Sequence, residues 1–346
     1  MIKWISIPDK IKKNAYEQIA EEKGMSAFAV EKDWWVTQAL TIIFEMDIAK
    51  HLVFKGGTSL SKAWNLIKRF SEDIDLAIDR EFFGFKGKLS KSRITKLRKA
   101  AGVFSTGVFF EELQQKFKNK GFKDLKFAVV DAKESDQDPR IIEVYYPNLI
   151  IQTSEYIVPG IQIEIGCRSL REPFTVQSFG SLVDEIYADK DFAAPFIQVP
   201  TVNPERTFLE KIFLLQEEFN RPKEKIRVDR LSRHLYDVYH LSKNDVADKA
   251  INDKQLYETI VAHRHKFSKV GGVNYNEHNP KKINPIPATE LIEAWKADYK
   301  MMLEEMIYEQ NAPTFEMLIE NLNKLKNRFR KTKWTFSLEF GTALFI

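Results

Sequence analysis

The chain has 346 residues, of which 44% are hydrophobic and 29% are charged, and its formal net charge is +4 at pH 7. These values are ordinary for a globular protein, and the length is sufficient for two domains. No apolar run reaches the roughly 18 residues of a membrane span, and the N-terminus does not lead into a secretory apolar segment. We therefore expect a cytoplasmic protein without a membrane partner, and the single cysteine, Cys167, agrees with a reducing compartment.

The first elements along the chain are expected to be two helices between residues 8 and 44. The first has an apolar stripe at helical spacing, and Ser26 is a suitable cap for the second. The second helix contains the segment VEKDWWVTQAL, residues 30–40. Two interpretations of this segment stay open. It is either a core helix anchored by two tryptophans beside a surface pair of Lys32 and Asp33, or a segment that contacts a ligand directly.

The strongest functional pattern is the stretch FKGGTSLSKAWNLIKRFSEDIDLAI, residues 54–78. Its second half reads as a strand in which Asp73 and Asp75 alternate with Ile74 and Leu76. Successive side chains on a strand point to opposite faces, so both carboxylates are expected on one face. Two neighbouring carboxylates repel each other unless a cation neutralises them, and oxygen ligands of this kind suit Mg²⁺.

The turn that precedes this strand is suited to phosphate binding. Two adjacent glycines let the backbone approach a ligand closely, and the helix expected after them offers unpaired backbone N–H groups to a phosphate. Two basic residues further along add positive charge. The expected phosphate-binding residues are Gly56, Gly57, Thr58, Ser59, Lys62 and Arg69.

The order of Gly-Gly-Thr turn, helix and paired acids resembles the signature of the polymerase-beta-like nucleotidyltransferase superfamily. In its longer form, GGTSLSK followed by RFSEDID, it resembles the AbiEii/AbiGii family, the toxin half of abortive-infection toxin–antitoxin pairs. The resemblance covers residues 32–237. It implies a phage-defence toxin that transfers a nucleoside monophosphate from an NTP to an acceptor. RNA such as tRNA is the expected acceptor, Mg²⁺ the expected cofactor, and a cognate antitoxin the expected partner.

Enzymes of this superfamily place a third carboxylate on a neighbouring strand, and Glu164 in the segment IQIEI has the clearest apolar–acid–apolar context. We therefore expect Asp73, Asp75 and Glu164 to hold two Mg²⁺ ions, roughly 3.5–4 Å apart, that activate the attacking oxygen and stabilise the leaving one. The alternative is that Glu164 is a partly exposed strand residue paired with Arg168 or Arg171.

The expected fold class is α+β. Residues 1–199 are predicted to form a nucleotidyltransferase domain of helices packed on a mixed sheet, and residues 200–346 a helical domain that completes the active-site cleft. Three prolines between residues 195 and 204 break any helix at this boundary. Within the first domain, residues 141–146 and 149–153 are expected to pair as a hairpin.

Two motifs of the second domain are candidates to complete the site. A helix carries Thr207 and Lys211 four residues apart on the flank of its apolar stripe, where a lysine can hold a triphosphate. The Thr-x-x-Glu-Lys pattern resembles a recurring motif of the toxin family, and Arg-His-x-Tyr-Asp in the next helix resembles its last motif, which makes Asp237 an active-site candidate that orients Lys211 or a nucleophile. The alternatives are a surface lysine paired with a glutamate, and a surface pair of Arg233 with Asp237.

Three basic clusters, within residues 86–99, 116–126 and 324–333, are candidates for contact with RNA. The first two are equally well explained as a solvated helical face, and the dipole of the closing helix is enough to explain the third. Basic clusters without a base-reading module suit recognition of the backbone of a structured RNA. Two other functions stay open: transfer of a nucleotide to a hydroxyl side chain of a protein, and a catalytically inactive relative that binds nucleic acid.

Overall fold

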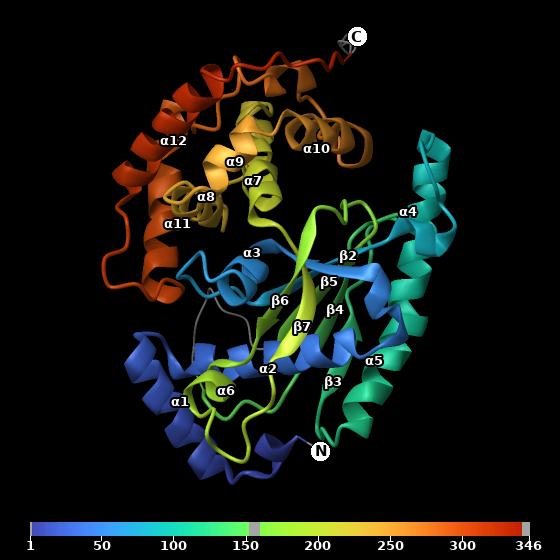
Figure 1. Ribbon diagram of the computed structural model, residues 1–346, viewed down its shortest axis with the longest axis vertical. Helices are drawn as coiled ribbons and strands as arrows, with labels where there is room; N and C mark the ends of the chain where they lie inside the picture. The colour runs from blue at the N-terminus through green and yellow to red at the C-terminus, as the bar shows by residue number, and fades with distance from the viewer. Residues whose placement is uncertain (1, 152–159, 341–346) are drawn as a thin grey trace. The chain divides into compact units, whose positions relative to one another are not determined.

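A computed structural model of the chain describes residues 2–151 and 160–340 (Figure 1). The chain divides into two compact units. Unit 1 comprises Met1–Val202 and Met306–Gln310, and unit 2 comprises Asn203–Glu305 and Asn311–Ile346. Unit 1 contains a mixed sheet with helices, and unit 2 is helical over its described residues. The α+β class with a mixed sheet, expected from the sequence, is therefore confirmed.

The described residues of unit 1 contribute seven strands to the sheet, in the order β3-β4-β5-β2-β1-β7-β6. The strands are β1 (Leu52–Lys55), β2 (Asp73–Ile78), β3 (Lys126–Val129), β4 (Arg140–Tyr145), β5 (Ile161–Gly166), β6 (Phe174–Phe179) and β7 (Ile197–Val202). Strand β2 pairs antiparallel with β1 and parallel with β5, and β1 pairs parallel with β7. The strand that carries the two aspartates therefore lies at the centre of the sheet.

Strand β2 has one buried and one half-exposed face. Ile74 and Leu76 are buried, whereas Asp73 and Asp75 are partly exposed. This is the alternation that the sequence predicts, because side chains on a strand have a period of two residues. The buried residues of β1, β2, β4 and β5 continue across the strands and form an apolar sheet face. Asp73 and Asp75 lie on the opposite, partly exposed face of the sheet.

The helical segments of unit 1 surround this sheet, and α2 packs on α1 and against β2 and β5 (Figure 1). They are η1 (Lys3–Ser6), α1 (Asp9–Lys23), α2 (Ala27–Phe44), η2 (Asp47–His51), α3 (Gly56–Thr58), η3 (Ser59–Ala63), η4 (Arg80–Phe83), α4 (Lys91–Thr106), α5 (Val108–Asn119) and α6 (Leu182–Ile186). Helix α2 begins after Ser26, whose hydroxyl accepts a hydrogen bond from the backbone N–H of Ala29 at 3.2 Å, as expected of an N-cap. Nearly all of α2 is buried.

The expected hairpin between residues 141–146 and 149–153 is wrong. Strand β4 pairs antiparallel with β3 and β5, and residues 149–151 lie outside any strand. Residues 152 and 153 lie outside the described part of the chain. The backbone N–H groups of Leu149 and Ile150 donate to the carboxylate of Glu31 at 2.8 and 2.9 Å. Because this side chain satisfies groups that a strand partner would otherwise have to satisfy, the segment needs no strand on that side.

The helical segments of unit 2 gather around α7, which packs against α8, α9 and α10. They are α7 (Pro204–Phe219), η5 (Lys223–Lys225), α8 (Ser232–Leu241), α9 (Val246–Asn252), α10 (Lys254–Phe267), η6 (Tyr275–His278), η7 (Thr289–Leu291), α11 (Ile292–Glu305) and α12 (Phe315–Arg330). Leu318, Leu322 and Leu325 of α12 are buried on its apolar face. Among residues 2–151 and 160–340, no helix combines the length and apolar character that a membrane span needs.

A buried carboxylate on α7, that of Glu217, is held by two basic side chains of unit 2. Glu217 is 2% exposed, and its Oε1 lies 2.8 Å from Nε of Arg264 and 3.4 Å from Nε2 of His278. Burial alone raises the pKa of Glu217, but the Arg264 guanidinium and the His278 ring outweigh it and lower the pKa from 4.5 to about 2.

Glu217→Gln is expected to lower the melting temperature at pH 7 more than at pH 3. The pKa of Glu217 is lower in the folded protein than in the unfolded chain. Its ion pairs therefore contribute stability above the unfolded pKa, and this contribution is lost as the pH falls toward about 2. Thermal unfolding of both proteins across this pH range measures the difference. A decrease of equal size at every pH would contradict the assignment.

Candidate active site

The Gly-Gly turn lies directly against the aspartate strand. Gly56 has a φ of +81°, and a Cβ atom at this position would lie 1.9 Å from Oδ2 of Asp75. A Cβ at Gly57 would lie 2.6 Å from Nη2 of Arg69 and 2.7 Å from Oγ of Ser71. Real Cβ atoms do not approach other atoms this closely, so both positions accept only glycine without a shift of these side chains. The turn thus brings main-chain groups beside a carboxylate and a guanidinium.

Gly56→Ala is expected to displace the carboxylate of Asp75 and to destabilise the protein by about 1–3 kcal/mol, since the new methyl group adds a steric clash to an unfavourable φ. Gly84→Ala is the matched control. Gly84 has a similar φ of +77°, but no heavy atom lies within 4 Å of its Cβ position. Thermal unfolding of both variants separates backbone strain from the clash. Equal losses in the two variants would contradict a special role for the contact with Asp75.

The two hydroxyl groups of the turn point into the protein. Thr58 is fully buried, and its Oγ1 donates to the carbonyl of Asp73 at 2.6 Å and lies 3.0 Å from Oγ of Ser71. Ser59 is also fully buried, and its Oγ donates to the carbonyl of Gly56 at 2.9 Å. Thr58 thus fastens the turn to the start of β2, and Ser59 closes the turn on itself. Any contact of Thr58 and Ser59 with a phosphate is therefore left to their backbone N–H groups.

The helical segment after the glycines changes its type within a few residues. Helix α3 covers Gly56–Thr58 only, and the chain then continues as one π-helical segment, Ser59–Ala63. Such a short element has little dipole of its own, because the macrodipole grows with the number of aligned peptide units. The dipole of α3 alone is therefore expected to add little to phosphate binding.

The two basic residues of the motif line one cavity of about 270 Å³ within unit 1. Lys62 and Arg69 share its wall with Ser61, Asn65 and Ser71. The cavity is thus polar, and it borders the residues that flank Gly57. The carboxylates of β2 are not among its lining residues.

Helix α2 supplies charge partners to this motif. Nζ of Lys32 lies 2.5 Å from Oε2 of Glu72, and these side chains are 2% and 5% exposed. Asp33 forms an ion pair with Lys62, and its second oxygen accepts from the backbone N–H of Leu182 at 2.8 Å. The interpretation of Lys32 and Asp33 as a surface pair is therefore wrong. Each is buried and bonded to a residue of the motif, which ties α2 to the turn and the strand.

The acids of the two central parallel strands share a face. Asp75 of β2 lies directly opposite Glu164 of β5, and Asp73 lies on the same face two residues earlier. Lys55 of β1 is opposite Asp75 on its other side, with Nζ 3.6 Å from Oδ1. Sequence reasoning did not select Lys55. The one feature of the sequence that could have indicated Lys55 is its position immediately before the Gly-Gly turn. Antiparallel pairing of β1 with β2 then places it opposite Asp75.

Carboxylate oxygens at these positions have the chemistry that Mg²⁺ prefers. In the described ranges, however, no group of three or more His, Cys, Asp or Glu side chains is arranged to hold a metal ion. Arg168 and Arg171, the alternative partners considered for Glu164, form ion pairs with Asp138 and Asp79, each at 3.1 Å. Carboxylate oxygens are thus the right type of ligand for Mg²⁺. That the three carboxylates bind one ion site together stays a prediction.

The candidate residues of unit 2 form a buried cluster. Nζ of Lys211 lies 2.8 Å from Oδ2 of Asp237 and 3.4 Å from Nδ1 of His234. The side chain of Lys211 is 9% exposed and that of Asp237 is fully buried, so the interpretations as a surface lysine and a surface Arg–Asp pair are wrong. Thr207 is buried as well, and its Oγ1 has no hydrogen-bond partner among the described residues. A buried hydroxyl without a partner is costly, so it is a group that a ligand can satisfy.

The comparisons with known proteins agree with the motifs. A family profile described as "Nucleotidyl transferase AbiEii toxin, Type IV TA system" matches residues 38–321. The search of curated proteins gave no match.

Similar solved structures include MenT4, a nucleotidyltransferase toxin from Mycobacterium tuberculosis H37Rv, at 14% identity and a TM-score of 0.44, over 94% of this chain and 98% of that one. JHP933 from Helicobacter pylori is 13% identical, with a TM-score of 0.41 and coverage of 89% and 94%. A protein described as a putative nucleotidyltransferase from H. pylori is 13% identical, with a TM-score of 0.39 and coverage of 85% and 92%.

The family profile spans most of the chain and includes the Gly-Gly turn, the aspartate strand and the Lys211–Asp237 cluster. The resemblance noted in the sequence is thereby confirmed, and the chain belongs to the AbiEii nucleotidyltransferase toxin family.

Proposed function

We propose that this protein transfers a nucleoside monophosphate from an NTP to RNA, with tRNA as the expected acceptor, and releases pyrophosphate. Membership of the toxin family supports the reaction class. The observation that carries the proposal is the contact between Gly56 and Asp75, which sets the backbone of the turn beside an acidic sheet face. A turn that binds phosphate and an acid that binds a cation need this proximity, because the same triphosphate must touch both.

In unit 1 the proposed division of roles follows from charge. Gly57 and the cavity lined by Lys62 and Arg69 would bind the phosphates, while Asp73 and Asp75 of β2 and Glu164 of β5 would hold Mg²⁺. When bound, this ion supplies Lewis-acid activation of the phosphoryl group.

Lys55 lies beside Asp75 and has the role of a counter-charge to the acids. Its ammonium group lies 3.6 Å from Oδ1 of Asp75, and both side chains are partly exposed. It therefore reduces the repulsion among the carboxylates before substrate is present.

We assign the domain of residues 200–346 a part in the same reaction. Asp237 holds the ammonium group of Lys211 in place at 2.8 Å, and Lys211 would offset the negative charge that develops on the departing pyrophosphate. The unpartnered hydroxyl of Thr207, one helical turn away, would donate to a phosphate oxygen. The domain of residues 1–199 then supplies the phosphate turn and the carboxylates.

Among the three basic clusters, the one at α4 is best suited to an RNA backbone. Its exposed cations form no ion pair with residues 2–151 or 160–340. They are Lys86, Lys88, Lys91, Arg93, Lys96 and Lys99. In the other clusters, Lys120 pairs with Glu45, Lys324 with Glu320 and Arg328 with Asp248. Cations without acidic partners release the most counterions when phosphates bind.

The triple substitution Lys91→Gln, Lys96→Gln and Lys99→Gln is expected to weaken RNA binding and to reduce the slope of log affinity against log salt by about 2 to 3. The KM for RNA should rise while the KM for NTP stays unchanged. The matched control changes Lys116, Lys118 and Lys120 to glutamine, a cluster in which Lys116 and Lys120 already contact Glu45. A control that weakens binding as much as the α4 variant would contradict the α4 assignment.

Purified protein incubated with each labelled NTP, with and without total tRNA, tests the proposal directly. Label on RNA supports it. Label on a protein would instead establish a protein-modifying nucleotidyltransferase, and no label with any NTP would favour an inactive nucleic-acid-binding relative. Addition of EDTA should abolish transfer if Mg²⁺ is required, and restored Mg²⁺ should recover it.

The biological setting proposed here is abortive infection, a phage-defence response in the cytoplasm, in which a cognate antitoxin restrains the toxin. Family membership supports the toxin and the existence of an antitoxin in general terms. Expression of the chain with and without the neighbouring gene, followed by growth curves with and without phage, tests this setting. Growth that is unaffected by the chain in both cases would exclude it.

A further inference from the structure

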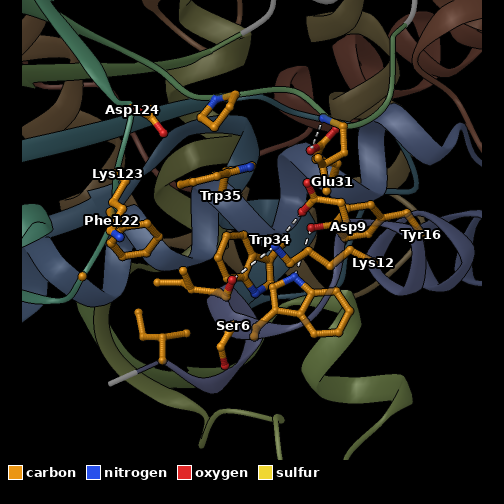
Figure 2. A pocket seen from close by; sticks show the side chains of 16 residues that line it. Ser6, Asp9, Lys12, Tyr16, Glu31, Trp34, Trp35, Phe122, Lys123 and Asp124 are labelled. Atoms are coloured by element: carbon orange, nitrogen blue, oxygen red, sulfur yellow. Dashed lines mark hydrogen bonds and ion pairs between the residues drawn. The ribbon is translucent and has the colours of Figure 1, made fainter.

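Unit 1 contains a cavity of about 600 Å³ that involves none of the residues assigned to nucleotide transfer. It lies among η1, α1, α2 and the loops at residues 121–124 and 147–149. Figure 2 shows its side chains, with Trp34 and Trp35 of α2 between Phe122 on one side and Tyr16 on the other. Its volume is within the usual size of sites for small molecules.

The walls of the cavity are aromatic and fixed by mutual contacts. The ring of Trp34 lies 4.9 Å from that of Trp35 and 6.5 Å from that of Trp4, and Trp35 lies 5.4 Å from Phe122. The indole N–H of Trp4 donates to the hydroxyl of Tyr16 at 3.1 Å. Because these rings hold each other in place, the cavity is formed before any ligand arrives, and it presents several aromatic faces to a ligand.

A buried carboxylate forms part of the wall. Glu31 is 1% exposed, and its two oxygens accept hydrogen bonds from the backbone N–H groups of Leu149 and Ile150 at 2.8 and 2.9 Å. A carboxylate has about four acceptor sites, so each oxygen keeps capacity for a further donor. Burial raises the pKa of Glu31, opposed by the two backbone hydrogen bonds and by Lys12, which means that a nearby positive charge would relieve an existing cost.

The charges around the cavity favour a cation over an anion. The lining residues include three acids, Asp9, Glu31 and Asp124, and two bases, Lys12 and Lys123. Nζ of Lys12 is already engaged, at 3.2 Å from Oδ1 of Asp9 and 3.3 Å from the carbonyl of Ile5. The lining as a whole therefore carries an excess of one negative charge, and its most buried member is an acid.

We propose that this cavity is a binding site for a small organic cation, a primary ammonium group carried on a short aromatic or apolar body. The body packs against the rings of Trp34, Trp35 and Phe122, and the ammonium group donates to Glu31. Aromatic faces attract cations through their quadrupole, and a buried carboxylate supplies the counter-charge. A neutral ligand can pack on the aromatic rings but gains no charge interaction with Glu31, and an anion is repelled by Glu31.

Helix α2 connects the cavity with the motif of residues 54–78, because it contacts both. Glu31, Trp34 and Trp35 face the cavity, whereas Lys32 and Asp33 on the same helix hold Glu72 and Lys62. A ligand in the cavity thus contacts the helix that positions the phosphate-binding residues. It does so without touching them.

Three matched probes test the proposal on the full chain: 2-phenylethylammonium, 2-phenylethanol and 3-phenylpropionate. Titration calorimetry and the fluorescence of the tryptophans measure binding at pH 7. The ammonium probe is expected to bind about tenfold more tightly than the alcohol, and the carboxylate probe most weakly. Equal affinity for all three, or binding of none, would overturn the proposal.

Two variants assign the preference to Glu31. Glu31→Gln keeps the size of the side chain and an oxygen acceptor, and it should remove the advantage of the ammonium probe over the alcohol. Lys12→Met leaves Glu31 intact and removes a cation from the wall, and it should tighten binding of the ammonium probe, which keeps the test available if Glu31→Gln does not fold. Glu45→Gln, outside the cavity, is the control and should change nothing. An unchanged preference in a folded Glu31→Gln variant, or no tightening in Lys12→Met, would overturn the proposal.

Discussion

Asp73→Asn and Asp75→Asn are each expected to lower the rate of nucleotide transfer by about 10²- to 10³-fold or more and to remove growth inhibition, without lowering the melting temperature. Asparagine keeps the size of aspartate but not its charge. Both residues lie on the half-exposed face of β2, where water can solvate the amide that replaces the carboxylate. Initial rates with labelled NTP, growth curves and thermal unfolding of the variants measure the three quantities.

The matched control for this pair is Glu143→Gln on β4. Glu143 lies opposite Gln162 of β5, which is itself opposite Asp73, so it is on the same sheet face two strands away. Its carboxylate accepts a hydrogen bond from the hydroxyl of Tyr145 at 2.6 Å. Glu143→Gln should leave transfer unchanged. Full activity of Asp73→Asn would reject the assignment of the reaction to these acids.

Lys32→Met is expected to destabilise the protein by about 3–5 kcal/mol, because it leaves the carboxylate of Glu72 buried without its ammonium partner. The side chains of both residues are almost inaccessible to water, at 2% and 5% exposure, so solvent cannot replace the lost partner. Denaturant unfolding, with the midpoint and slope fitted separately, measures the change. Transfer activity should fall in parallel, since Glu72 immediately precedes Asp73.

Two further variants isolate the cause of this loss. Lys32→Met with Glu72→Leu removes both charges of this buried pair, and most of the lost stability should return. Lys296→Met is the exposed control. Its partner Glu316 lies at the same 2.5 Å, but the two side chains are 51% and 64% exposed, so water can solvate Glu316 and little loss of stability is expected. If Lys296→Met proved as damaging as Lys32→Met, burial could not be the reason.

The elements that could be predicted are those whose signal is local. The alternation of Asp73, Ile74, Asp75 and Leu76 needs only the period of a strand, and the structure has this strand with these faces. The resemblance to a known superfamily added Glu164, and the structure places it on the strand next to β2 although 89 residues separate it from Asp75. The roles of these acids in catalysis stay a prediction.

What could not be predicted depends on partners distant in the sequence. Lys32 and Asp33 look like surface residues in a sequence, because charged side chains are seldom buried unless they are paired. Their partners follow 40 and 29 residues later, and no local pattern names them. Lys211 and Asp237 pair in the same way across two helices. The hairpin failed for a related reason, since the side chain that satisfies the backbone at Leu149 comes from α2.

The two ion pairs of α2 also limit how the motif can be used elsewhere. The strand–turn–strand unit, residues 54–78, contains Lys62 and Glu72, and both are neutralised from outside the unit. If this unit alone were grafted onto a new scaffold, Lys62 and Glu72 would be buried without the ion-pair partners that α2 supplies. A designer would have to transplant the Lys–Asp doublet with it, and a genome search for this chemistry gains specificity by demanding that doublet upstream of the glycines.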